Sequence, residues 1–111
     1  GRKKDMIKTG GENVFAVEVE NTIAEIPGVA ECAVFGLPDP KWDEIIAAVI
    51  VPRSGMTVTE DEVVTFCREH LAPYKTPRVV RIQTEALPQS GAGKIQKRDI
   101  KEALLASLNE D

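Results

Sequence analysis

A glycine-rich loop near the C-terminus ends in a lysine, in the run Ser90-Gly91-Ala92-Gly93-Lys94. Glycines allow such a loop to move and allow its backbone N–H groups to approach phosphate oxygens, while the ammonium adds a compact positive charge. A nucleotide-binding P-loop is excluded, because that motif needs a glycine and a Ser or Thr where this chain has Pro88 and Ile95. Taken alone, the loop fits either a lysine that contacts phosphate or a flexible surface turn with a solvated lysine.

The overall charge argues against a general nucleic-acid binder. The net charge is −4 and the isoelectric point is near 5.1, whereas such binders need a cationic surface to neutralise phosphates. The positive charge is nevertheless uneven and gathers near the two ends of the sequence, at Arg2, Lys3, Lys4 and Lys8 and at Lys94, Lys97, Arg98 and Lys101. The glycines beside these lysines favour a functional role over a merely solvated face.

Metal binding and membrane insertion find no support in the sequence. Cys32 and Cys67 are too few for a disulfide framework, and each lies in an apolar pattern that a small buried side chain would satisfy. A structural zinc site needs four ligands, and only Cys67 and His70 lie near each other. No apolar run reaches the roughly 18 residues that a membrane helix requires. We therefore expect no bound metal, no membrane span and a reduced, cytoplasmic setting.

The first half of the chain predicts one helix followed by two strands. Apolar residues from Ala16 to Ile26 follow helical spacing, and Pro27-Gly28 ends that run. The segment Val29 to Phe35 is rich in valine and alanine, which favours a strand closed by the turn residues Gly36, Pro38, Asp39 and Pro40. Ile45 to Val51 is a continuous apolar run, so we expect a strand buried on both faces at the centre of the sheet.

A capping signal opens the next helix, because Thr59 followed by Glu62 allows the hydroxyl and the carboxylate each to satisfy a free backbone N–H. Helical spacing then continues to about Leu71. Residues 79–82 follow a proline and alternate apolar side chains with arginine. We expect them to form an edge strand that presents Arg81 to one face and its two neighbours to the other.

A third amphipathic helix is predicted from the apolar spacing between Ile100 and Leu108. Near the N-terminus, the adjacent Gly10 and Gly11 are typical of a tight hairpin turn between two short strands. The order of elements therefore predicts one α+β domain over residues 1–111, with a small, mostly antiparallel sheet, three helices and an N-terminal β-hairpin.

Several spaced motifs agree in order along essentially the whole chain. They are Gly1-Arg2-Lys3-Lys4-Asp5, Ile7 to Val14, Val34 to Asp39, Ala72 to Arg78, Leu87-Pro88 and Gly93-Lys94. In this order they resemble the C-terminal domain of the superfamily of AMP-forming acyl-CoA synthetases, adenylation domains and firefly luciferase. Several motifs together are far more specific than any single one. One departure is Asp43-Glu44 after Trp42, where the family usually has Gly-Glu, and it concerns the turn before the central strand.

The resemblance implies that Lys94 supplies the lysine of the first half-reaction, in which a carboxylate attacks the α-phosphate of ATP and pyrophosphate leaves. A cation placed near both anions would stabilise the charge that builds on the phosphoryl oxygens. The Pro88 to Lys94 spacing is also similar to the acetylated motif of some acyl-CoA synthetases. A lysine acetyltransferase that acts on Lys94 is therefore an expected partner.

The resemblance also implies roles at the start of the chain. Lys4 matches the hinge about which the domain rotates after the adenylate has formed. Arg2 matches a residue that contacts the nucleotide ribose. Glu18 and Glu20, in contrast, are expected to cap or solvate the first helix rather than to act as catalytic carboxylates.

The segment from Lys8 to Glu12 matches the second face, which the rotation brings to the active site for thioester formation. Lys8 is the second expected catalytic lysine. Gly10, Gly11 and Glu12 are implied to contact coenzyme A, because glycine lets the backbone lie against its thin pantetheine arm. A hairpin turn at the same glycines is compatible with this role.

We therefore expect the chain to be the mobile C-terminal domain of a fatty-acid or aryl-acid CoA ligase. A large N-terminal domain would bind ATP with its magnesium and the carboxylic acid, and the isolated domain would be inactive and hold no cofactor. Two alternatives remain open: the C-terminal part of an adenylation domain that loads a carrier protein, and a non-catalytic binding module of the same fold. The latter would predict loss of the glycines or of Lys94, and both are present.

Overall fold

The structure is a computed structural model that describes residues 5–89, 91 and 93–109. Arg2 and Lys4, the expected ribose contact and hinge, lie outside these residues. The elements follow in the order β1 (Met6–Thr9), β2 (Glu12–Phe15), α1 (Ala16–Ala24), β3 (Val29–Asp39), β4 (Asp43–Pro52), α2 (Glu60–His70), the short 3₁₀ helix η1 (Pro73–Lys75), β5 (Val79–Ile82) and α3 (Lys97–Asn109). The predicted α+β class, with three α-helices in the described residues and an N-terminal hairpin, is confirmed.

β4 lies at the centre of a five-stranded sheet, as the sequence predicted. β3 pairs with it in antiparallel fashion from Val29 opposite Pro52 to Asp39 opposite Asp43. β1 pairs with the start of β4 in antiparallel fashion, and β5 pairs with its second half in parallel. The sheet is therefore mostly antiparallel. A continuous apolar sequence suits β4, because a central strand covered on both faces has no solvent-facing side.

β3 is longer than the sequence predicted, because it continues to Asp39 through Gly36 and Pro38 instead of ending at Phe35. Among the described strands it pairs only with β4, and a strand with one unpaired edge can accommodate proline. Gly36 has a packing role, since a Cβ there would come within 2.7 Å of the Glu44 carboxylate. Gly36 and Pro38 are therefore accommodated within β3 and do not end it.

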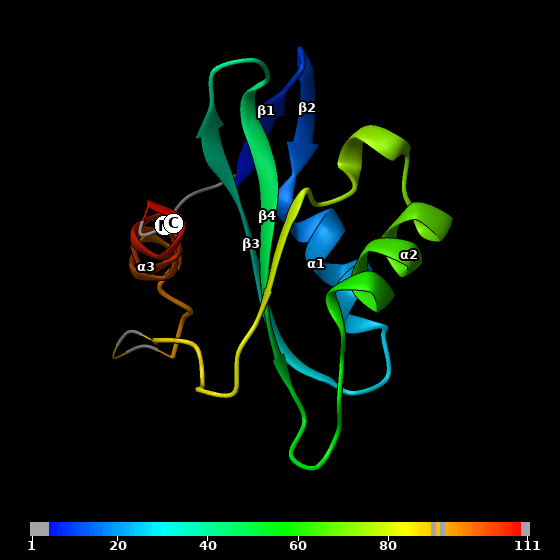
Figure 1. Cartoon of the computed structure of the whole chain (residues 1–111), viewed down its shortest axis with the longest axis vertical. Coiled ribbons are helices and arrows are strands. Elements are labelled where there is room, and N and C mark those ends of the chain that lie inside the picture. The colour runs from blue at the N-terminus through cyan, green and yellow to red at the C-terminus, as the bar shows by residue number, and fades with distance from the viewer. Residues whose placement is uncertain (1–4, 90, 92, 110–111) are drawn as a thin grey trace.

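The helices form one layer on each face of the sheet. Figure 1 shows α3 on one side of the strands and α1 with α2 on the other. Alternate strand residues consequently serve two hydrophobic cores. The core under α1 and α2 includes Ile23, Ile46, Ile50 and Val63, and the core under α3 includes Phe35, Val49, Ile100 and Leu104. Each such side chain contributes about 1.5–3 kcal/mol when it is fully buried.

β5 divides its side chains between the two faces as predicted. Val80 and Ile82 join the core under α1 and α2. Arg81 points the other way, and its Nη1 donates to Ser107 Oγ of α3 over 2.8 Å. The strand therefore links both helical layers.

The predicted capping box at the start of α2 is present. The Glu62 N–H donates to Thr59 Oγ1 over 3.1 Å, and the Thr59 N–H donates to Glu62 Oε1 over 2.9 Å. α1 ends at Ala24, slightly before the predicted end, although Ile26 remains buried beside it. The helix stops there because Pro27-Gly28 cannot continue it.

Candidate functional site

The segment that carries Lys94 is fixed at its base. Gln89 and Ile95 form an isolated antiparallel bridge, and the Gln96 N–H donates to the Pro88 carbonyl over 2.8 Å. Ile95 also packs against the core under α3. Lys94 is exposed next to this base. The fold therefore presents the predicted catalytic lysine at the surface beside an anchored segment.

Lys94 lines an open groove of about 660 Å³. The walls come from the segment before β1, from three strands, from the segment before α3 and from the start of α3. The lining residues are Asp5, Met6, Ile7, Phe35, Gly36, Glu44, Lys94, Ile95, Lys97, Arg98 and Lys101. The lysines and the arginine outnumber the carboxylates of Asp5 and Glu44. This excess of positive charge favours the approach of an anion to Lys94.

Lys97, the first residue of α3, joins three other parts of the fold in a contact that the sequence did not predict. Its Nζ forms an ion pair with Asp5 Oδ2 and lies 2.8 Å from Glu20 Oε2 of α1. The same Glu20 oxygen accepts the Val34 N–H of β3 over 2.9 Å. Asp5 and Lys97 are 92 residues apart, so no local spacing reveals the pair.

Gly10 and Gly11 form the two-residue turn between β1 and β2. Their φ angles are +57° and +84°, and a tight hairpin with two left-handed residues requires such values. The Gly10 N–H donates to the Trp42 carbonyl over 2.9 Å, and a Cβ on Gly10 would come within 2.9 Å of the indole. A Cβ on Gly11 would meet none of the described residues within 4 Å, apart from its chain neighbours. The hairpin prediction is confirmed, and the surface over Gly11 is open.

A small pocket of about 90 Å³ lies beside this turn and includes residues that had no predicted role. It is lined by Thr9, Gly10, Glu12, Trp42, Pro73, Tyr74 and Arg78. The Arg78 guanidinium lies 4.6 Å from the centre of the Trp42 ring, within cation–π range. Tyr74 and Arg78 belong to the motif Ala72 to Arg78. That motif contributed to the family resemblance but did not indicate what either residue does.

β1 connects the two regions. Its first two residues line the groove of Lys94, and its last residue, Thr9, lines the pocket beside the glycines. The two regions share no lining residue, so they are distinct places on the domain. Lys8 lies between them with an exposed side chain, and its N–H donates to Glu44 Oε1 over 2.9 Å. The structure does not bring Lys8 into either pocket.

Glu18 and Glu20 hold other elements to α1, which corrects the expectation that they mainly cap or solvate that helix. Glu18 accepts two hydrogen bonds from Lys75 Nζ of η1, at 2.9 and 3.0 Å. The hydrogen bond to this carboxylate raises the pKa of Lys75 above its usual value. Glu20 binds Lys97 and the backbone of β3. Both acids therefore have structural partners outside their own helix.

The two cysteines are neutral thiols, of which Cys67 is buried and Cys32 is partly buried. Burial raises the pKa of Cys67 to about 11, and burial together with Glu20 raises the pKa of Cys32 to about 11, so neither is a thiolate at neutral pH. Within the described part of the chain, no group of three His, Cys, Asp or Glu side chains is arranged to hold a metal ion. No helix in that part is long and apolar enough to cross a membrane.

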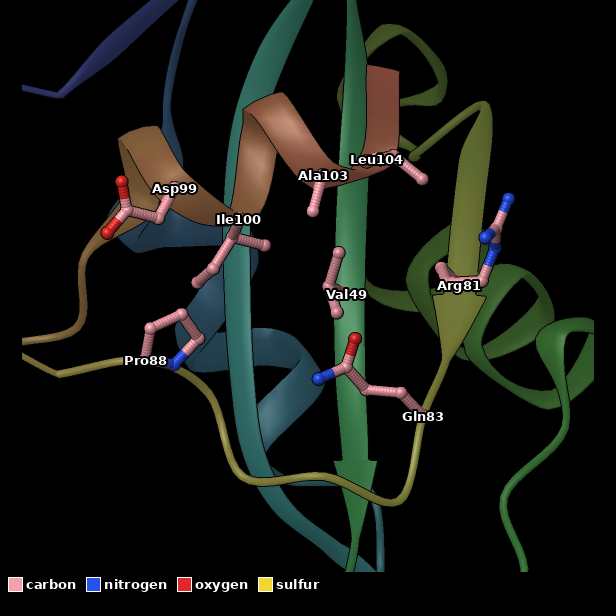
Figure 2. Close-up of a pocket in the computed structure, with 8 residues that line it drawn as sticks. All are labelled: Val49, Arg81, Gln83, Pro88, Asp99, Ile100, Ala103 and Leu104. Atoms are coloured by element: carbon pink, nitrogen blue, oxygen red, sulfur yellow. The ribbon is translucent and has the colours of Figure 1, made fainter. Parts of the chain in front are cut away.

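A further pocket of about 160 Å³ lies between α3 and the sheet. Figure 2 shows Asp99 and Arg81 on opposite sides of an apolar floor that includes Val49. Arg81 is already bonded to Ser107. The pocket shares no lining residue with the groove of Lys94 or with the pocket beside the glycine turn. We interpret it as a gap left where α3 covers only part of the sheet.

The comparison with known families agrees with the motifs. Residues 18–94 match the model of the AMP-binding enzyme C-terminal domain. The chain belongs to this family. This AMP-binding enzyme C-terminal domain is 47% identical over 100 residues to a feruloyl-CoA synthase from Amycolatopsis sp, covering 90% of the chain and 20% of that protein. It is also 47% identical over 107 residues to the long-chain-fatty-acid–CoA ligase FadD13 of Mycobacterium tuberculosis, covering 96% of the chain and 21% of the ligase.

Solved structures contain the same fold. The AMP-binding enzyme C-terminal domain superposes on a Mycobacterium tuberculosis fatty acyl CoA synthetase with a TM-score of 0.84 and 46% identity, covering 93% of this chain and 20% of that one. It superposes on ATP-bound MatB from Rhodopseudomonas palustris with a TM-score of 0.85 and 38% identity, with the same coverages of 93% and 20%. The domain thus spans about a fifth of the length of the relatives that it matches.

Proposed function

We propose that this chain is the mobile C-terminal domain of an AMP-forming ligase that joins a fatty or aryl carboxylic acid to coenzyme A. The observation that carries the proposal is that the groove of Lys94 and the Gly10–Gly11 turn lie at different ends of β1. Two separate regions on one small domain suit an enzyme with two half-reactions. The names of the relatives support the ligase class. A large N-terminal domain that holds ATP with its magnesium and the acid is the implied partner.

In the first half-reaction, a carboxylate oxygen of the acid attacks the α-phosphorus of ATP. The bond from that phosphorus to the bridging oxygen breaks, and pyrophosphate leaves with the electron pair. Lys94 is the proposed catalytic residue, because its exposed ammonium lies in a groove of net positive charge where two anions can approach it. The anchored base of its segment supports a preorganised position, which is what makes such a charge effective in the transition state.

In the second half-reaction, the thiolate of coenzyme A attacks the acyl carbonyl of the adenylate, and AMP leaves. The open surface over Gly11 would let the pantetheine arm lie against the backbone. Arg78 on the face of Trp42 stands beside this turn, where a guanidinium and an indole suit the phosphates and the purine of a nucleotide. Lys8 and Glu12, both exposed on the same hairpin, are the further residues proposed for this step.

The exchange of the two faces would be a rotation about Lys4, with Arg2 contacting the ribose. Both residues precede the described part of the chain. Asp5, the next residue, is held by Lys97. A hinge at Lys4 would therefore have a fixed point directly after it, as a rigid rotating domain requires.

The ligase reaction of the intact enzyme tests this proposal. The protein with its large domain is supplied with ATP, magnesium, coenzyme A and a panel of fatty and aryl acids, and AMP, pyrophosphate and thioester are measured. We expect the three products in equal amounts with at least one acid. A strong preference for a carrier protein over coenzyme A would assign the chain to a carrier-loading enzyme. Failure to form an adenylate with any acid would favour a binding module.

A further inference from the structure

We propose that Lys97 is a positioning residue for adenylate formation, because its ion pairs with Asp5 and Glu20 fix the direction in which the fold presents Lys94. The inference rests on the function proposed above and adds a residue to it. Lys97 does not touch the reacting atoms in this account. It acts through the segment that carries Lys94.

Lys97 stands where the glycine-rich segment becomes α3. It is the first residue of that helix and follows Lys94 by three positions. Between the two lysines, Ile95 is bridged to Gln89, and Gln96 donates to the Pro88 carbonyl. Both residues between Lys94 and Lys97 are therefore held by backbone pairing to the segment 88–89. A shift of the first turn of α3 would carry Lys94 with it.

The ion pairs are better placed to fix geometry than an exposed pair would be. The side chains of Lys97 and Glu20 are only 27% and 22% exposed. A single surface pair contributes little, because water screens it and two long side chains lose freedom. Here one ammonium bridges two carboxylates, and Glu20 is further held by the Val34 N–H. Such a connected network restrains its members more than a pair does.

The network also includes Asp5, the residue directly before β1. Asp5 precedes β1 and lines the same groove as Lys94 and Lys97. The ion pair therefore connects the residue before β1 with the first residue of α3, the helix that follows Lys94. The glycine turn lies beyond the other end of β1. Loss of Lys97 should consequently affect the half-reaction that uses Lys94 and spare the one that uses the turn.

The test is the substitution Lys97→Met in the intact enzyme. Methionine is unbranched like lysine but carries no charge. We expect the rate of acyl-adenylate formation to fall by about tenfold to a hundredfold, the range expected when a catalytic group is misplaced by about 1 Å. Transfer from a supplied acyl-adenylate to coenzyme A should change little. Lys97→Arg should recover most of the adenylation rate, because a guanidinium can also serve two carboxylates.

Lys101→Met is the matched control. Lys101 lies one turn further along α3 and lines the same groove, so its replacement removes the same charge without removing the ion pairs. We expect a smaller loss of adenylation than for Lys97→Met. Asp5→Asn should slow adenylation less than Lys97→Met, because Lys97 keeps its ion pair with Glu20 in that variant. The double variant should be no worse than Lys97→Met, since Lys97→Met already removes the pair with Asp5.

Several results would overturn the inference. The first is full adenylation by Lys97→Met. The second is an equal loss of both half-reactions in Lys97→Met, which would indicate a general structural role. The third is a loss of adenylation in Lys101→Met as large as in Lys97→Met, which would indicate that only the charge of the groove matters. Lys94→Ala is measured beside them. If Lys94→Ala kept full adenylation, the proposed function would fail at its central residue, and positioning by Lys97 would fail with it. If Lys94→Ala lost adenylation and Lys97→Met did not, only the inference about Lys97 would be wrong.

Discussion

Asp43 is the only non-glycine residue with a positive φ in the described part of the chain, at +74°. The motif that this chain resembles usually has glycine at this position, so the one visible departure from the motif coincides with a strained backbone. The turn is nevertheless formed, and Asp39 Oδ2 accepts the N–H groups of Lys41 and Trp42 at 2.9 and 2.8 Å. Aspartate can occupy this position because it tolerates the left-handed region better than most residues.

Asp43→Gly is expected to stabilise the domain. The left-handed conformation costs a residue with a side chain about 1–2 kcal/mol, and the flexibility of glycine in the unfolded chain offsets about 0.5–1 kcal/mol of that. We therefore expect the free energy of unfolding in urea to rise by about 0.5–1 kcal/mol. Asp43→Val should lower it, because a β-branched residue is least suited to this φ. Equal stability of all three proteins would show that the position is not strained.

Acetylation of Lys94 is expected to stop adenylate formation, because it would remove the charge that we propose for the first half-reaction. The exposure of Lys94 makes its amine accessible to a modifying enzyme. The adenylation rate of the intact enzyme should fall in proportion to the acetylated fraction, as measured by mass spectrometry, and should return after deacetylation. An enzyme fully acetylated at Lys94 that kept its activity would end this idea.

At the scale of elements, local sequence signals located the helices and the central strand. The capping box at Thr59 and the continuous apolar run of β4 are local patterns with one good structural solution. The end of β3 was mispredicted because Gly36 and Pro38 are turn formers locally. Their pairing with Ile46 and Glu44 across the sheet depends on residues outside the local window. Long-range pairing decided the length of β3.

Thr59→Ala is expected to lower the free energy of unfolding by about 1 kcal/mol, because it removes the hydroxyl that accepts the Glu62 N–H at the start of α2. Thr57→Ala is the control, since Thr57 is exposed and lies just outside the cap. Thermal unfolding followed by circular dichroism compares the two variants. If the cap contributes to stability, the midpoint temperature of unfolding should fall for Thr59→Ala and not for Thr57→Ala. Identical midpoints for the two variants would argue against this contribution.

At the scale of the whole molecule, the parts of the site differed in how visible they were in the sequence. Lys94 and the glycine pair stand in short local motifs that drew attention to them, and their expected roles came from the resemblance of several such motifs, in order, to a known family. The contact of Lys97 with Asp5 joins opposite ends of the chain, and the stacking of Arg78 on Trp42 joins two separate loops. Both depend on the completed fold, so spacing along the chain does not reveal them.

The isolated domain is expected to be inactive. One lysine without a pocket for the acid and a binding site for the triphosphate does not bring the reactants together, and most of the rate enhancement in such reactions depends on that positioning. The domain is mixed with ATP, magnesium and a panel of acids, and pyrophosphate release is compared with a protein-free blank. Release above the blank would show that the domain catalyses adenylation without its partner.

Rates of the two half-reactions, measured separately in the intact enzyme, show whether Lys94 and the glycine turn serve different steps. Lys94→Ala should slow adenylate formation by a few hundredfold, about 3–4 kcal/mol for one preorganised charge, and leave transfer from a supplied acyl-adenylate to coenzyme A nearly intact. Gly11→Asn should do the reverse, because asparagine tolerates the φ of +84° while its side chain obstructs the open surface over the turn. If both half-reactions fell together in each variant, the two regions would not serve separate steps, and the proposed function would be wrong.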